Sequence, residues 1–127
     1  MRYLTPEQVL FIHARLIAET GGAHGVRDLG LLESAVSRPQ AVFEGVELYP
    51  DVLQKAAALL ESLINNHPFV DGNKRTGITA AAMFLQVNNY SLTVSNRELE
   101  SFVLSIASGE QTFDSIVEWL KINSTSN

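Results

Sequence analysis

The segment from Thr76 to Val87 constrains the fold more than any other part of the chain. Its apolar residues would cover nearly every side of a helix: Ile78, Ala80, Ala81, Ala82, Met83, Phe84 and Leu85. A helix that is apolar all round has to be surrounded by other elements, so this one belongs in the middle of a helical bundle. No apolar run in the chain reaches the roughly 18 residues of a membrane-spanning helix.

Five other segments carry signals for the surrounding helices. They begin near Thr5, Asp28, Asp51, Ser95 and Thr112, and apolar residues recur along them at helical spacing. Thr5 is followed by a proline and an acidic residue, the order typical of a helix start, and Ser95 to Glu98 has the spacing of a capping box. The sequence therefore predicts an all-α fold, a compact bundle of about six helices, in a single domain spanning residues 1–127.

Two segments depart from the helical pattern. Residues 40–49 carry no helix signal, and Glu44-Gly45 is suited to turn a short hairpin between Val42-Phe43 and Val46–Tyr49. We therefore expect a short non-helical flap at about 40–49. The polar residues 123–127 are expected to fray, as chain ends without apolar anchors commonly do.

Composition and charge exclude several classes of protein. Nine Lys and Arg stand against fourteen Asp and Glu, a formal net charge of -5, which argues against direct nucleic-acid binding. The absence of cysteine excludes a disulfide framework and thiolate metal sites. The first residues lack the apolar stretch of a signal peptide. We expect a cytoplasmic protein that does not bind membranes.

A turn rich in polar residues lies between the helix that begins near Asp51 and the central helix. Pro68 disfavours helical geometry at the residue before it, so the earlier helix has to end near His67. Gly72 permits a sharp backbone turn, and Asn73 is a favoured N-cap for the helix that follows. Asn65 and Asn66, just upstream, either cap the preceding helix or contact a substrate.

The start of the central helix has the chemistry of an anion site. The N–H groups of Gly72, Asn73, Lys74 and Arg75 would point out of a helix N-terminus, whose dipole favours negative charge. Two cations at that end oppose the dipole, and a bound anion, most simply a phosphate, would offset the cost. We therefore expect these four residues to bind phosphate.

One histidine and one carboxylate stand next to this expected phosphate site. His67 carries an imidazole, a side chain suited to take a proton from a hydroxyl group. Asp71 supplies a single hard oxygen ligand, which suits Mg²⁺ held jointly by phosphates rather than a cage made by the protein alone. A base, two cations and a magnesium carboxylate together indicate a phosphoryl-transfer site.

The run His67-Pro-Phe-Val-Asp-Gly-Asn-Lys-Arg75 resembles the signature of the Fic/Doc superfamily, in its death-on-curing (Doc) branch. The resemblance extends to Gly21-Gly22, to residues 27–35 and to Lys55-Ala-Ala-Ala58, so it covers nearly the whole chain. The family's fold is a compact helical bundle, which agrees with the bundle expected from periodicity. In such a bundle we expect Phe69 to be a buried anchor that holds the motif loop.

Two departures from the Fic pattern H-x-F-x-(D/E)-G-N-G-R-x-x-R bear on the reaction. Lys74 replaces the second glycine, and Ile78 replaces the last arginine. Fic enzymes with the full pattern transfer AMP to a protein hydroxyl. In the Doc branch, the lysine goes with a reversed nucleotide and with transfer of the terminal phosphoryl group of ATP to a Thr or Ser hydroxyl of a translation elongation factor. The resemblance thus implies a Mg²⁺- and ATP-dependent protein kinase toxin.

Three further implications concern regulation and the alternatives. Some Fic enzymes carry a self-inhibiting helix with the pattern (S/T)-x-x-x-E-(G/N), but the only glutamate here followed by Gly or Asn is Glu44, and Gln40 stands four residues before it. The resemblance implies instead a separate small antitoxin whose disordered C-terminal segment folds into an apolar groove near the His67 loop. AMP transfer to a protein hydroxyl and a non-catalytic binding module remain as alternatives.

Other polar and aromatic residues are expected to have ordinary structural roles. His13 lies on an apolar stripe and is expected to pack at the edge of the core, whereas His24 lies between glycines and is expected at the surface. Phe113 and Trp119 are expected in the core. Arg38 is expected to be a solvated arginine rather than a phosphate contact, and Lys55 carries no functional signal.

Overall fold

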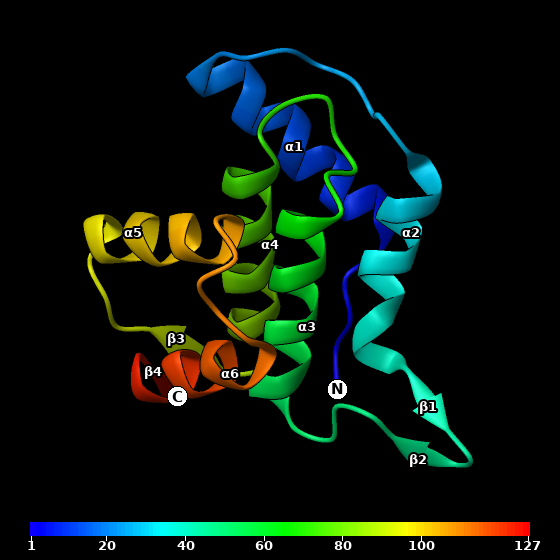
Figure 1. The fold of residues 1–127 in the computed structure, drawn as a ribbon, viewed down its shortest axis with the longest axis vertical. Helices are drawn as coiled ribbons and strands as arrows, with labels where there is room; N and C mark the ends of the chain where they lie inside the picture. Colours follow the sequence, from blue (N-terminus) through cyan, green and yellow to red (C-terminus); the bar gives the residue numbers. More distant parts are fainter.

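The computed structural model describes all residues 1–127 and confirms the mainly α-helical fold (Figure 1). Its helices are α1 (Pro6–Thr20), α2 (Leu29–Ser37), α3 (Val52–Asn65), α4 (Asn73–Val87), α5 (Asn96–Ala107) and α6 (Phe113–Ile122). The short elements are the 3-10 turn η1 (Arg38–Gln40) and the strands β1 (Val42–Phe43), β2 (Val46–Glu47), β3 (Tyr90–Leu92) and β4 (Ser124–Ser126). None of the helices combines the length and the apolar character that crossing a lipid bilayer requires.

Helices α3 and α4 lie side by side at the centre, and the other helices surround them (Figure 1). Small residues allow this close packing: Ala56, Ala57 and Ala58 of α3 and Ala80 and Ala81 of α4 are fully buried. At Gly77 of α4, a Cβ atom would lie only 3.1 Å from Cγ1 of Ile64. The segment that is apolar on all sides therefore lies at the centre, as its sequence predicts, but one side of it stays open, and Met83 is 38% exposed.

Each helix begins close to the residue expected from the sequence. Thr5, Asp51 and Thr112 form complete capping boxes with the residue three positions on. Ser95 is also an N-cap, but the box is incomplete because the Glu98 carboxylate contacts the Ser95 hydroxyl rather than the backbone. The expectation for α4 was wrong in detail: Gly72 is the N-cap and Asn73 is already helical.

The expected flap at 40–49 is a hairpin of β1 and β2, in which Phe43 pairs with Val46. Glu44 and Gly45 turn it with positive φ angles of 51° and 79°, as a two-residue hairpin loop requires. Its apolar side chains are exposed. In Figure 1 the hairpin lies at the end of the bundle away from the loop that joins α3 to α4.

Lys55 anchors this hairpin, a role that the sequence did not indicate. Its side chain, 2% exposed, donates from Nζ to the carbonyl oxygen of Pro39 at 3.1 Å and to Oε1 of Glu47 at 3.0 Å. Burial alone would lower the pKa of Lys55, but its bond with Glu47 leaves that pKa raised above the ordinary value. The lysine is therefore a buried cation with partners on both sides of the hairpin.

Arg38 also differs from its expected solvated state. Its guanidinium donates to the Tyr49 hydroxyl at 2.9 Å, to Glu61 Oε1 at 2.8 Å and to Ser62 Oγ at 2.9 Å, and it lies over the ring of Phe113. Arg38 thus joins η1 to α3 and α6. Phe113 and Trp119, which were expected in the core, are only partly buried and pack against its edge.

The tail at 123–127 is paired, where the sequence suggested fraying. Residues 124–126 form β4, which runs antiparallel to β3 with Ser91 opposite Thr125. Asn127 continues the pairing, because its N–H donates to the carbonyl oxygen of Asn89 at 2.7 Å. The backbone bonds of a polar strand replace the apolar anchor that the tail lacks.

The tight contact at Gly77 predicts the effect of enlarging that residue. Gly77→Leu should lower the free energy of unfolding by about 1–3 kcal/mol, because overpacking α3 against α4 outweighs the gain of up to about 1 kcal/mol in helix propensity. Urea unfolding followed by circular dichroism measures the change. Gln86→Leu is the control, since it adds the same side chain to an exposed position of α4. Equal stability of the two variants would contradict the close packing.

Candidate active site

The turn between α3 and α4 begins with an unusual backbone conformation at His67. Asn66 is the C-cap of α3, and His67 follows with a φ angle of 49°, in the left-handed region that non-glycine residues seldom adopt. Pro68 then prevents the helix from continuing. The His67 side chain is exposed, and its ring makes no hydrogen bond to the protein.

A second segment, residues 23–28, lies along the motif loop and fixes it through backbone bonds. The N–H groups of Arg27 and Asp28 both donate to the carbonyl oxygen of Pro68, at 2.8 and 3.0 Å. Val26 and Phe69 form an isolated antiparallel bridge, and the N–H of Val70 donates to Gly25 at 3.1 Å. The loop is therefore held as part of a short irregular ladder.

Phe69 and His13 join the loop to the core. Phe69 is 1% exposed, and its ring stacks on that of His13 with centroids 3.8 Å apart and planes 5° apart. His13 is buried, as expected, but it also reaches the motif: its Nε2 lies 2.8 Å from the carbonyl oxygen of Asp71. Because a carbonyl only accepts, Nε2 carries the proton. The apolar stripe of α1 gave no signal for this contact.

Asn73 acts on the loop through its side-chain amide. The amide oxygen accepts from the N–H of Phe69 at 2.9 Å, and the amide nitrogen donates to the carbonyl oxygen of the same residue at 3.0 Å. The side chain is therefore neither a helix cap nor available to a phosphate. Only the backbone N–H of Asn73 faces the expected anion site.

The N-terminus of α4 is open. Gly72, the N-cap, has a φ of 78° and offers no capping side chain, and a Cβ there would lie 3.0 Å from Cδ1 of Ile17. The N–H of Gly72 donates to Asp71 Oδ1 at 2.8 Å, so it is not free for an anion as expected. The N–H groups of Asn73, Lys74 and Arg75 have no partner and remain as the donors of an anion site.

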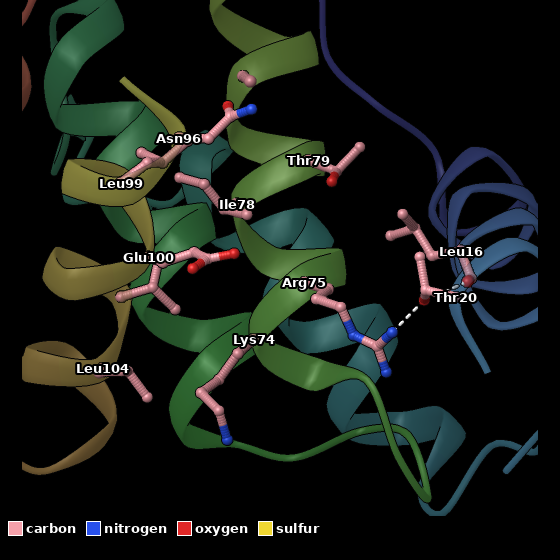
Figure 2. A pocket seen from close by; sticks show the side chains of 12 residues that line it. Leu16, Thr20, Lys74, Arg75, Ile78, Thr79, Asn96, Leu99, Glu100 and Leu104 are labelled. Carbon is pink, nitrogen blue, oxygen red and sulfur yellow. Dashed lines mark hydrogen bonds between the residues drawn. The ribbon is translucent and has the colours of Figure 1, made fainter. Parts of the chain in front are cut away.

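The two cations at this turn have different surroundings (Figure 2). Arg75 points towards α1, where its guanidinium donates to the hydroxyl of Thr20 and, at 3.4 Å, to the carbonyl oxygen of Gly21. Lys74 is exposed and makes no ion pair or hydrogen bond. An unpaired cation at a helix N-terminus is electrostatically unfavourable without an anion.

The Asp71 carboxylate bonds to backbone on both sides. Oδ2 accepts from the N–H of Ala23 at 3.1 Å and Oδ1 from Gly72 at 2.8 Å. These two bonds hold the pKa of Asp71 below its ordinary value, and the bond with Ala23 has the larger effect. The charge of Arg75 lowers this pKa further. The carboxylate is therefore ionised at neutral pH.

An exposed, ionised carboxylate whose oxygens each accept one N–H keeps lone pairs for a metal ion. No group of three or more histidine, aspartate or glutamate side chains gathers anywhere in the chain. Asp71 would be able to hold Mg²⁺ only as a single protein ligand, so phosphates and water would have to complete the coordination.

A cavity of about 750 Å³ opens beside the N-terminus of α4 (Figure 2). Its walls come from α1 at Leu16 and Thr20, from α4 at Lys74 to Ala82, and from α5 between Asn96 and Leu104. Its volume lies in the range of about 300–1,000 Å³ typical of ligand pockets. Lys74 and Arg75 line it, whereas His67, Phe69 and Asp71 do not.

The fold and the site together define a mainly α-helical protein whose central helix starts in a basic, open turn behind a His-x-Phe-x-Asp-Gly-Asn loop. The chain belongs to the Fic/DOC family, whose family model matches residues 3–85. It is 57% identical over 72 residues to a protein of Mycolicibacterium smegmatis named Toxin Doc, a match that covers 57% of this chain and 55% of that relative. It is also 31% identical over 121 residues to the Protein kinase doc of Escherichia phage P1, covering 95% of this chain and 94% of the phage protein.

The bonds of Asp71 predict how stability depends on pH. A lowered carboxyl pKa stabilises the fold at pH values above the ordinary value of 3.8, and this contribution disappears as the pH falls through the lowered value. Asp71→Asn should therefore be less stable than the wild type near neutral pH, and the difference should shrink at about pH 3. Urea unfolding at both pH values measures it.

The control is Glu33→Gln, since Glu33 is exposed on α2 and makes no hydrogen bond. A difference between wild type and Asp71→Asn that stays constant with pH would contradict the assigned bonds of the carboxylate.

Proposed function

We propose that this chain is the toxin of a type II toxin–antitoxin pair and a protein kinase, which transfers the terminal phosphoryl group of ATP to a Thr or Ser hydroxyl of a translation elongation factor. The observation that carries the proposal is Lys74, an exposed cation without a partner at the open N-terminus of α4. The names of the two relatives, a toxin and a protein kinase, support it. Blocked translation would explain why such a protein acts as a toxin.

The proposed reaction assigns a task to each residue of the motif loop. His67 is the general base: its exposed ring takes the proton of the substrate hydroxyl as the oxygen–phosphorus bond forms and the bond between the γ-phosphorus and the bridging oxygen breaks. ADP leaves with that oxygen. Phe69, buried beneath the loop, keeps the segment that carries His67 in place.

The phosphates are proposed to lie at the start of α4. The N–H groups of Asn73, Lys74 and Arg75 and the ammonium group of Lys74 face them, while the Arg75 guanidinium would leave Thr20 to reach them. Asp71 would hold Mg²⁺, which neutralises the charge of the phosphates when it is bound. Gly72 has a structural part, because its missing Cβ allows Ile17 of α1 to pack close to the turn.

Two alternatives remain, and Ile78 bears on the first. Transfer of AMP to a protein hydroxyl uses an arginine at this position in the full Fic pattern, but here an isoleucine lines the cavity, so the phosphate clamp of that reaction would be incomplete. The second is a non-catalytic binding module. Against it stands Lys74, because an unpaired cation at an open helix N-terminus is a costly feature for a surface that only packs.

The measurement that tests the proposal is the intact mass of a candidate elongation factor after incubation with the protein and Mg·ATP. We expect a gain of one phosphoryl group, and a fall of about 10²–10⁴-fold in the rate with His67→Ala, because that is the usual cost of losing a positioned base. His24→Ala is the control, since His24 is exposed and makes no hydrogen bond. Thermal unfolding of both variants should match the wild type.

Each other outcome of this measurement identifies a different error. A gain of one adenylyl group would establish the AMP-transfer alternative. No gain with any nucleotide would favour the binding module. Full activity of His67→Ala would remove the base assignment, and activity that survives EDTA would remove the metal from Asp71.

We further propose that a separate small antitoxin restrains the protein. No segment of the chain matches the self-inhibiting pattern, because Gln40 stands where Ser or Thr is needed before Glu44. The cavity beside α4 has an apolar rim at Leu16, Leu99 and Leu104, the last 57% exposed. A disordered C-terminal segment that folds into an amphipathic helix would cover this rim and block access to Lys74.

Co-expression tests the antitoxin. Expression of the wild type alone should arrest growth, and a short protein encoded next to it should restore growth and co-purify with the chain. Leu104→Glu should weaken that complex, because it places a charge on the apolar rim. The control Phe11→Glu, at an exposed position of α1 that does not line the cavity, should not. Normal growth with the unrestrained wild type would remove both toxin and antitoxin.

A further inference from the structure

Arg27 contacts the proposed base through that residue's main chain. Its Nε–H donates to the carbonyl oxygen of His67 at 2.6 Å, and its Nη2–H donates to that of Asn66 at 2.7 Å. These two donors form one edge of the planar guanidinium, so a single fork grips two successive carbonyl groups. No other side chain bonds to the backbone of His67.

A third carbonyl group of the turn is bound by backbone N–H groups of the same segment. The N–H groups of Arg27 and Asp28 share the carbonyl oxygen of Pro68. The carbonyl groups of residues 66, 67 and 68 are therefore all bound by the same two residues of the neighbouring segment. This is how the chain leaves α3 with a fixed direction although it has no regular secondary structure there.

The conformation of His67 makes this grip important for the direction of its ring. Its φ angle of 49° lies in the left-handed region, which is strained for a non-glycine residue. The ring itself is exposed and bonds to no protein atom. The protein therefore controls the ring only through the backbone angles of His67, which fix the direction of its Cα–Cβ bond.

We propose that Arg27 is a positioning residue for His67: its guanidinium holds the left-handed turn that points the imidazole at the substrate hydroxyl. The inference rests on the proposed function for the role of His67, but the two hydrogen bonds from Arg27 to the turn do not depend on that function. A cation at the end of α3 also stabilises the helix. A purely structural role would lower stability and leave the orientation of His67 unchanged.

The experiment compares Arg27→Ala and Arg27→Lys with the control Arg15→Ala, because Arg15 is an exposed arginine paired only within α1. For Arg27→Ala we expect kcat to fall about 10²-fold, the usual cost of misplacing a reacting group by about 1 Å, with KM for ATP unchanged. Arg27→Lys should recover only part of the loss. An ammonium group can bind one of the two carbonyl groups, but it lacks the planar fork that binds both.

A second measurement does not depend on activity. In nuclear magnetic resonance spectra, the Cα and Cβ shifts of His67 should report the left-handed conformation in the wild type and in Arg15→Ala, and lose it in Arg27→Ala. Wild-type shifts in Arg27→Ala would overturn the proposal, as would wild-type kcat or a parallel rise in KM. A wild type that transfers no group at all would overturn the proposed function alone, because the shifts still decide whether Arg27 holds the turn.

Discussion

The close approach of α3 and α4 is the constraint on which the rest of the structure depends. Gly77 allows the two helices to pack closely, because the side chains of Leu60, Leu63 and Ile64 of α3 occupy the space that a Cβ would fill. Because they are antiparallel neighbours, the end of α3 and the start of α4 lie at the same end of the bundle (Figure 1). The short connection between them is then forced to turn sharply, and the motif residues lie on that turn.

Much of the fold follows from local signals. Thr5, Asp51 and Thr112 cap helices because their side chains reach the N–H three residues on, a relation visible in any sequence. The hairpin at Glu44-Gly45 is equally local. The strand β4 was not foreseen, because its residues are polar and its stability comes from pairing with β3, more than thirty residues away. Arg38 and Lys55 were misjudged for the same reason: their partners lie on other elements.

In the candidate site, too, some features follow from local sequence and others depend on residues far away in the chain. The sequence indicated an ionisable loop in front of a basic helix start, because the motif is contiguous. It predicted the wrong N-cap for α4, Asn73 instead of Gly72. Gly72 takes that place because its left-handed geometry fits against Ile17, while Phe69 needs the amide of Asn73 for its own backbone. His13 and Arg27 were not assigned to the site, since their contacts with the loop join residues some forty to sixty positions apart.

The bonds between residues 23–28 and the motif loop have a consequence for how this stretch tolerates sequence drift. Apart from the two bonds of the Arg27 guanidinium, they use main-chain atoms of the stretch, which every amino acid except proline supplies. Ala23, His24 and Val26 are therefore free to vary without loosening the loop. Gly22 and Gly25 are not, because a Cβ would meet the Asp71 carboxylate at 2.6 Å and the Val70 side chain at 3.2 Å. The side chains of this stretch are therefore replaceable at several positions while its backbone keeps the same path. Only the positions at which a side chain or a missing Cβ contacts the motif loop are constrained.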